Sequence, residues 1–151
     1  GKKIVETKKE ENMEQEQLDT LKERIYAFMR EDAYRPLPEA ELRAGLGLPE
    51  SEGKELSDAL AALEAEGAVI RNRSGLYGLP SRMNLVVGRL SMSPKGFGFI
   101  IPDVRETEEE TDVFVPGSAM STAMHGDRVV ARVTPSEQPG RAREGEIIRI
   151  L

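Results

Sequence analysis

The chain of 151 residues has no cysteine and a single histidine, His125. Without cysteine there are no disulfides and no thiolate metal ligands, which is typical of a reducing cytoplasm, where we expect the protein to reside. One histidine leaves too few ligands for a histidine-based zinc site. No run of about 18 apolar residues occurs, so no transmembrane helix and no membrane partner are predicted. No apolar segment near the start indicates a secretory signal.

Acidic side chains are missing from one long stretch. The net charge of −6 argues at first against nucleic-acid binding. Residues 67–102, however, contain no Asp or Glu. The same stretch holds Arg71, Arg73, Arg82, Arg89 and Lys95. Because the distribution of charge matters more than its sum, this stretch is a candidate cationic surface for nucleic acid.

The first half of the chain has helical periodicity, followed by a hairpin pattern. Residues 1–17 are polar and aperiodic, so we expect them to be disordered and partly derived from an expression vector, with Met13 as the native start. Apolar residues at helical spacing predict helices over residues 18–32, 39–46 and 49–66. Two short apolar runs, 68–71 and 76–79, flank a turn-rich tetrad and predict a β-hairpin. Three helices and a hairpin indicate a winged-helix domain over residues 18–80.

From residue 85 the apolar pattern has a period of two. Five strands are predicted, over residues 85–93, 97–102, 112–115, 128–134 and 143–151, with a short helix or turn over 117–124. Five short strands with turn signals fit a small OB-type β-barrel over residues 85–151. The polar residues just before it mark a domain boundary. The sequence thus predicts an α+β chain of two small domains, which we expect to be monomeric.

The segment Lys95–Ile100 carries the clearest functional signal. Phe97 and Phe99 are two residues apart and therefore point to the same face of a strand. Glycines alternate with them although glycine weakens a strand, and one reason for such glycines is that another molecule lies flat against the surface. Two coplanar rings beside a lysine form a stacking platform for unpaired bases, to which the next strand adds Phe114. The alternative is that all three rings belong to the core, as most phenylalanines do.

Cations near these rings are candidate phosphate contacts. We predict that Lys95, Arg89 and Arg128 meet phosphates, with the alternative that Arg128 is a solvated strand residue. A second nucleic-acid contact is predicted on the hairpin, at Arg71, Arg73 and Tyr77. The alternative there is a packed tyrosine and two solvated arginines. These features fit single-stranded RNA and single-stranded DNA alike.

No catalytic, metal-binding or cofactor-binding residue is predicted. His125 and Asp127 flank a glycine, but this tripeptide suits a tight turn and has no positioned nucleophile. The acidic run 106–110 lacks the spacing of a metal site and is predicted to be a solvated loop. The glycines of Lys95–Ile100 lack the third glycine and the following helix of a dinucleotide-binding loop.

Several separated pieces of the second half occur in a specific order. They are Gly88–Leu90, Lys95–Ile100, Pro102–Asp103, Asp112–Pro116, Ala123–Val129 and Glu144–Ile148. This string resembles the first cold-shock-like OB domain of the ribonuclease R branch of the ribonuclease II (RNB) family. The winged helix before it is similar to the N-terminal helix-turn-helix domain of the same enzymes. Pro116 departs from single-domain cold-shock proteins, which usually carry a base-stacking histidine there, and this departure implies a smaller platform and weaker binding.

The resemblance implies an RNA-binding front end for a processive 3′-to-5′ exoribonuclease, a hydrolase of RNA degradation. It would capture single-stranded RNA and guide it to a catalytic domain outside this chain, where clustered aspartates hold magnesium ions. The chain itself would then not be an enzyme and would need no cofactor.

Two alternatives place the function in the winged helix. A DNA-binding regulator would insert the third helix into the major groove, but the acidic side chains of residues 50–66 would be repelled by phosphates. A docking module would instead offer this acidic helix to a basic protein partner. Such a partner is compatible with RNA binding by the barrel.

Overall fold

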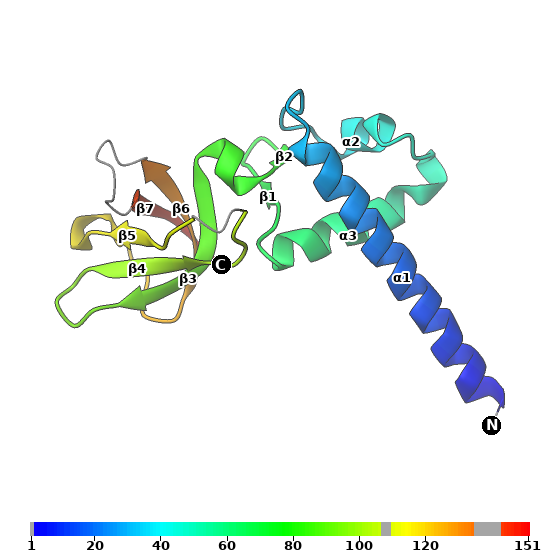
Figure 1. The fold of residues 1–151 in the computed structure, drawn as a ribbon, viewed down its shortest axis with the longest axis horizontal. Helices are drawn as coiled ribbons and strands as arrows, with labels where there is room; N and C mark the ends of the chain where they lie inside the picture. Colours follow the sequence, from blue (N-terminus) through cyan, green and yellow to red (C-terminus); the bar gives the residue numbers. More distant parts are fainter. Residues whose placement is uncertain (1, 107–109, 135–142) are drawn as a thin grey trace. The chain divides into compact units, whose positions relative to one another are not determined.

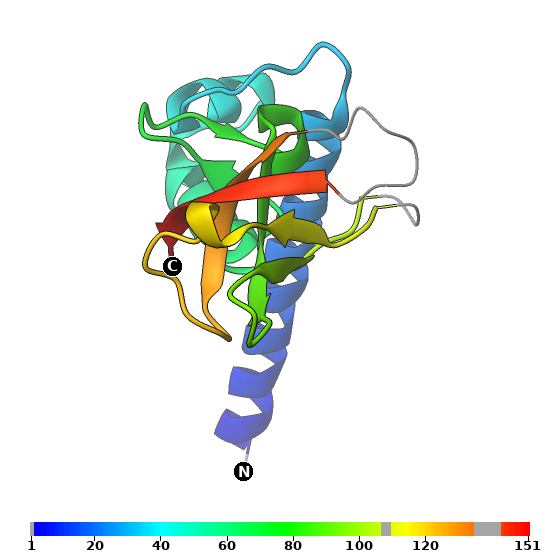
Figure 2. The same ribbon diagram turned by 90° about the vertical axis from the view of Figure 1, so that its left-hand side faces the viewer.

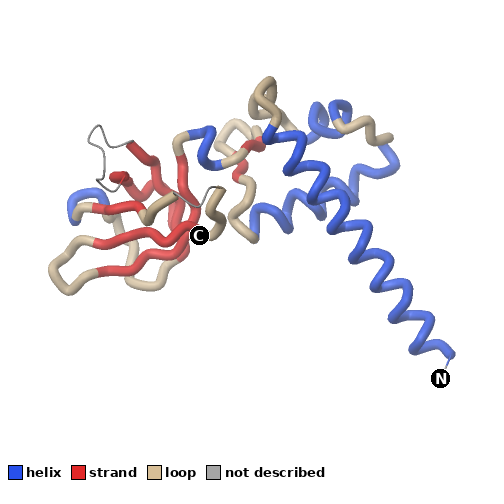
Figure 3. The backbone as a smooth tube through the Cα atoms, viewed as in Figure 1, coloured by secondary structure: helices blue, strands red, loops and turns tan. Residues whose placement is uncertain are grey.

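The computed structural model describes residues 2–106, 110–134 and 143–151 (Figure 1). The chain divides into two compact units, which we call the helical unit (Gly1–Ala65 and Val69–Leu79) and the barrel unit (Glu66–Ala68 and Pro80–Leu151). The α-helices belong to the first, and the long strands belong to the second (Figure 3). The predicted α+β architecture is therefore confirmed.

The helical unit has the predicted order of three helices and a hairpin. Its helices are α1 (Lys2–Arg30), α2 (Glu39–Gly45) and α3 (Gly53–Ala65), the last preceded by the 3-10 turn η1 (Glu50–Glu52). The strands β1 (Ile70–Arg71) and β2 (Tyr77–Gly78) pair antiparallel. Apolar side chains at helical spacing are buried, among them Ile25, Met29, Leu56 and Leu60. The hydrophobic stripes that predicted the helices thus form the core of the unit.

α1 begins far upstream of the predicted helix. Residues 1–17, which we expected to be disordered, lie in this helix from Lys2 onward, so the structure corrects that expectation. Residues 5–17 are all exposed, and hydrophobic periodicity therefore could not reveal them. The physical reason for the helix is composition, because Lys, Glu, Gln and Met are good helix formers. A local pair contributes as well, since Gln15 Nε2 donates to Asp19 Oδ1 one turn later, at 3.0 Å.

The barrel unit contains the five predicted strands, each ending within two residues of its expected bounds. They are β3 (Leu85–Met92), β4 (Gly98–Pro102), β5 (Val113–Val115), β6 (Arg128–Thr134) and β7 (Arg143–Ile150). Two 3-10 turns accompany them, η2 (Pro80–Met83) before β3 and η3 (Gly117–Ala119) after β5. The strands close a barrel in the order β3-β4-β5-β7-β6, with β5 and β7 parallel (Figure 2). This confirms the OB-type barrel.

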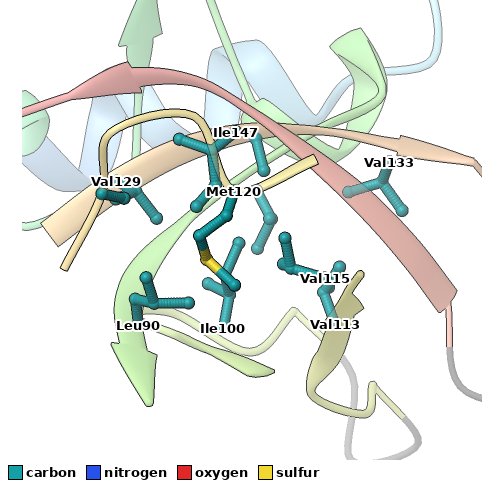
Figure 4. Close-up of a cluster of buried hydrophobic side chains, with 11 residues drawn as sticks. Leu90, Ile100, Val113, Val115, Met120, Val129, Val133 and Ile147 are labelled. Atoms are coloured by element: carbon teal, nitrogen blue, oxygen red, sulfur yellow. The ribbon is translucent and has the colours of Figure 1, made fainter. Parts of the chain in front are cut away.

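The interior of the barrel is filled by aliphatic side chains that converge from all five strands (Figure 4). Leu90, Ile100 and Val129 are at most 1% exposed. Met120, from the segment after η3, lies among them and fills the space left by the branched residues (Figure 4). Because side chains alternate along a strand, the residues between these core positions face outward. The barrel therefore encloses a packed core, and its exposed side chains lie on the outer face.

Two expectations concern loops and membranes. Residues 107–109 of the acidic run lie outside the described residues. Glu110 is not free, because its Oε1 lies 3.4 Å from Nη2 of Arg143, and its Oε2 accepts the N–H of Glu106 at 2.8 Å. Within the described ranges, no helix is both long enough and apolar enough to cross a bilayer.

Candidate nucleic-acid interface

Three of the four phenylalanines meet on the outer face of the barrel unit. β4 and β5 place Phe99 directly opposite Phe114, and their ring centroids are 5.6 Å apart. Phe97, just before β4, lies 5.8 Å from Phe114 and 6.1 Å from Phe99. The residues that alternate with the rings, such as Ile100 and Val113, are buried in the core. The rings are therefore outward-facing, and the reading that all three belong to the core is not supported.

The rings do not form the coplanar platform that the sequence suggested. Phe97 and Phe99 meet edge to face at 86°, and Phe114 is tilted by 48° to the first and 59° to the second. Such tilted pairs are the arrangement that the ring quadrupoles favour. Phe99 is 38% exposed, whereas the other two rings are half-buried. Phe99 is thus the most exposed of the three rings, and the other two pack against it.

The glycines beside the rings have structural roles, which corrects the argument that a ligand requires them. Gly96 has φ of 95° and donates its N–H to the carbonyl of Ser93 at 3.1 Å, so it closes the β3–β4 turn. A Cβ on Gly98 would lie 3.1 Å from Leu90 Cδ1 and 3.4 Å from Met120 Cε. It would therefore point into the filled barrel and not toward a ligand.

The three predicted phosphate contacts differ in their surroundings. Lys95 is exposed in the β3–β4 turn. Arg89 is exposed in β3, where it pairs with Ile101, two residues from Phe99 and on the same face. Its Nη1 donates to the Gly126 carbonyl at 2.9 Å. Arg128 instead forms an ion pair, with its Nε 2.7 Å from Oδ2 of Asp103. Lys95 and Arg89 are therefore the more accessible of the three predicted phosphate contacts.

The loop before β6 is structural. His125 Nδ1 accepts the N–H of Met92 at 3.0 Å, and Asp127 Oδ2 accepts the N–H of Met124 at 2.9 Å. Gly126 has φ of 88°, as a tight turn requires. The turn predicted at this tripeptide is confirmed. Among the described residues, no group of three or more His, Cys, Asp or Glu side chains could hold a metal ion.

Of the hairpin residues predicted to contact nucleic acid, Tyr77 is packed and not exposed. Tyr77 is 9% exposed, and its carbonyl accepts the hydroxyl of Tyr34 at 2.6 Å. Burial raises the pKa of Tyr77, with repulsion from Glu64 adding to this shift and the cation of Arg71 opposing it. The Arg71 guanidinium lies 5.7 Å from the centroid of the Tyr77 ring. Arg71 and Arg73 are exposed, so of the three only the arginines are accessible to nucleic acid.

A groove beside α1 and α3 is acidic. Glu11, Glu14, Glu55 and Asp58 line it together with a single cation, Lys54. Acidic side chains repel phosphates. The groove therefore weighs against the DNA-binding alternative, in which α3 enters the major groove.

Sequence reasoning missed the residues that flank the rings. Strand pairing places Ser91 opposite Phe99 and Glu144 opposite Phe114, so that one row of side chains crosses four strands. Ile101 follows Phe99 on the same face and is 47% exposed. The missing signal is the register of β5 on β7, which joins segments about 30 residues apart in sequence and which no local pattern encodes.

Comparison with known proteins is consistent with this architecture. Residues 88–150 match the family described as the ribonuclease B OB domain. The chain is 35% identical over 130 residues, 86% of its length, to ribonuclease R of Acidithiobacillus ferrooxidans, of which the match covers 28%. It is 34% identical over 92 residues to ribonuclease R of Escherichia coli, covering 61% of the chain and 11% of that protein.

A third relative extends over both units. The chain is 30% identical over 131 residues to ribonuclease R of Vibrio parahaemolyticus, which is 86% of the chain and 15% of the relative. The chain thus spans less than a third of the length of each of these proteins. The resemblance inferred from the separated sequence motifs is confirmed, because the chain is similar to ribonuclease R over most of its length and its residues 88–150 match the ribonuclease B OB domain.

Proposed function

We propose that the barrel unit binds single-stranded RNA, with unpaired bases stacked on Phe99 and Phe114. The observation that carries this proposal is the outward-facing cluster of three phenylalanines, because a ring left 38% exposed at Phe99 gains little from the core. A base stacked on such a ring contributes about 1–3 kcal/mol, with little dependence on sequence. Lys95 and Arg89 would meet phosphates, which adds affinity that falls with salt.

We further propose that the bound strand is guided to an exoribonuclease catalytic domain elsewhere in the parent protein. The name ribonuclease R of the relatives, and their much greater length, support this arrangement. The magnesium ions of the reaction would be held by that domain. The barrel unit would contribute capture and retention of an unpaired strand, and not the chemical step.

The proposal is tested by removing rings one at a time. We expect Phe99→Leu and Phe114→Leu each to weaken binding of a labelled single-stranded RNA by at least about fivefold in fluorescence anisotropy, the lower end of one lost base stack. Phe28→Leu is the matched control, since it removes a ring that packs against Tyr34 in the helical unit. Wild-type affinity in the Phe99 variant, or an equal loss in the Phe28 variant, would contradict the proposal.

A protein partner for the helical unit stays a prediction. The acidic groove beside α1 and α3 supports a basic partner, because Glu55 and Asp58 would attract Lys and Arg side chains. The groove belongs to the helical unit and the phenylalanine cluster to the barrel unit, so such docking uses residues other than those proposed to bind RNA.

A further inference from the structure

Glu144 lies beside the aromatic cluster on the outer face of the barrel unit. It is exposed in β7, and the parallel pairing of β5 with β7 places it directly opposite Phe114. The next residue, Gly145, is buried, so the strand alternation directs the Glu144 side chain outward. Paired positions on adjacent strands carry their side chains on the same face. The carboxylate therefore borders the two paired rings, Phe99 and Phe114.

The register gives Glu144 no cationic partner at its paired positions. Its neighbours across the two strand pairs are Phe114 in β5 and Thr134 in β6. Glu146, two residues later on the same face, differs because it is paired with Arg132. A carboxylate beside a surface that binds a polyanion lowers affinity unless it contacts the ligand. Glu144 therefore calls for a role in the complex.

The charges around the rings also restrict how a bound RNA strand can lie across them. The exposed cations come from β3, in the case of Arg89, and from the β3–β4 turn, in the case of Lys95, whereas the carboxylate of Glu144 lies at the β7 end of the aromatic row. Phosphates are attracted to the cations and repelled from the carboxylate. Bases stacked on Phe99 and Phe114 are then directed with their hydrogen-bonding edges toward Glu144.

A carboxylate only accepts hydrogen bonds, which limits the bases it can recognise. Guanine presents two adjacent donors on its Watson–Crick edge, N1–H and the N2 amino group, and these match the two oxygens of one carboxylate. Adenine and cytosine present an amino group next to an acceptor nitrogen, and uracil presents one N–H between two carbonyls. Two parallel charge-assisted hydrogen bonds are stronger and more selective than one.

We propose that Glu144 reads the base stacked at Phe114 and gives the site a preference for guanine. This inference rests on the proposed function, because it requires RNA bases on the phenylalanine rings. Glu144 is thus a specificity-determining residue, while the rings and the cations supply affinity without regard to sequence.

The test compares short uridine oligomers in which one central base is guanine, adenine, hypoxanthine or uracil. Adenine stacks as a purine without the paired donors, so the ratio of guanine to adenine affinity isolates hydrogen bonding from stacking. We expect the guanine oligomer to bind about five- to tenfold more tightly than the adenine oligomer, near the lower end expected for one bidentate contact. Hypoxanthine, which lacks the N2 amino group, should fall between them.

Glu144→Gln should reduce the ratio of guanine to adenine affinity to about one, and it should strengthen binding of the all-uridine oligomer because a negative charge is lost. Glu146→Gln removes the same charge two residues away and should keep the guanine preference. Equal affinities in the wild type, or a preference that survives in Glu144→Gln, would overturn the inference.

The failure of this inference is distinguishable from that of the proposed function. If all oligomers bind equally and Phe99→Leu weakens each of them, the proposed function holds and only the role of Glu144 is wrong. If no oligomer binds, or if binding is insensitive to Phe99→Leu, the proposed function fails and the guanine preference fails with it.

Discussion

At the scale of single residues, cations that are alike in sequence differ in what surrounds them. Lys95 and Arg128 are both predicted phosphate contacts, yet Lys95 is exposed in a turn and Arg128 is paired with Asp103 at 2.7 Å. The sequence marks both as cations close to the aromatic motif. It does not reveal the ion pair, because the partner is 25 residues away and is brought near by strand pairing.

This difference leads to a prediction about salt dependence. Lys95→Gln should reduce the slope of log affinity against log salt by about 0.7, the value for one phosphate contact on a single strand. Arg128→Gln should leave the slope nearly unchanged, since its guanidinium is engaged by Asp103. Affinities of a single-stranded RNA measured across a series of salt concentrations provide both slopes. An equal change in the two variants would show that the ion pair does not hold Arg128 in the complex.

Two glycines provide a second contrast between residues. A Cβ on Gly88 in β3 would lie 2.2 Å from the carbonyl oxygen of Ile101, and backbone cannot easily give way there. Gly88→Ala should therefore destabilise the barrel unit by about 3 kcal/mol or more, at or beyond the upper end of ordinary overpacking. Hydrogen exchange of the β3 amides measures this loss.

Gly53, at the start of α3, is the matched control for that substitution. Nothing lies within 4 Å of a Cβ built there, and its φ of −60° is helical. Gly53→Ala should leave the stability of the helical unit unchanged or raise it by about 0.5–1 kcal/mol. If Gly88→Ala changes stability as little as Gly53→Ala does, this result would contradict the close approach of β3 and β4 at Gly88.

At the scale of elements, the sequence predicts the helices and strands whose side chains pack in the core. It does not predict helical segments whose side chains are all exposed. The stripe of Leu21, Ile25 and Met29 predicts the buried part of α1, and these residues are in the core. The exposed residues 5–17 of the same helix carry no such stripe, so hydrophobic periodicity does not predict that they are helical. Strand existence follows from the period of two, whereas the register that unites Phe99, Phe114 and Glu144 depends on contacts far apart in sequence.

Within the helical unit, one hydrogen bond links the segment after α1 to β2. The Tyr34 hydroxyl donates to the Tyr77 carbonyl at 2.6 Å, and burial raises the pKa of both phenols above 10.0. A raised pKa in the folded state means that folding favours the protonated phenol. This stabilisation is complete below about pH 10 and is lost as the pH rises through the higher pKa of the folded state.

We therefore expect the helical unit to lose stability above about pH 10, while the barrel unit, which has no tyrosine, keeps more of its own. Thermal unfolding followed by NMR signals of α3 and β3 at several alkaline pH values separates the two units. Tyr34→Phe should flatten the pH dependence of α3 and cost about 1 kcal/mol at neutral pH, the value of one buried hydrogen bond. A parallel loss in both units would contradict the assignment to the tyrosines.

At the scale of the whole molecule, charge is distributed unevenly along a chain that is negative overall. The net charge is −6, yet residues 67–102 contain no acidic side chain. The acidic residues Glu11, Glu14, Glu55 and Asp58 gather on the groove of the helical unit. The sequence predicts the stretch without acidic side chains, because charge is counted by segment and not as a sum. It does not predict the groove, since Glu11 and Glu14 lie in the part of α1 that has no hydrophobic stripe.

The central claim is that RNA lies across the phenylalanine face of the barrel unit. Titration of the isotope-labelled chain with a short single-stranded RNA, followed by amide NMR shifts at low and moderate salt, examines this directly. We expect shifts concentrated in Lys95–Ile100 and Val113–Val115, with affinity that falls as salt rises. Silent β4 and β5 amides, with a response to duplex DNA in α3 or the β1–β2 hairpin, would contradict it and assign the function to the winged helix.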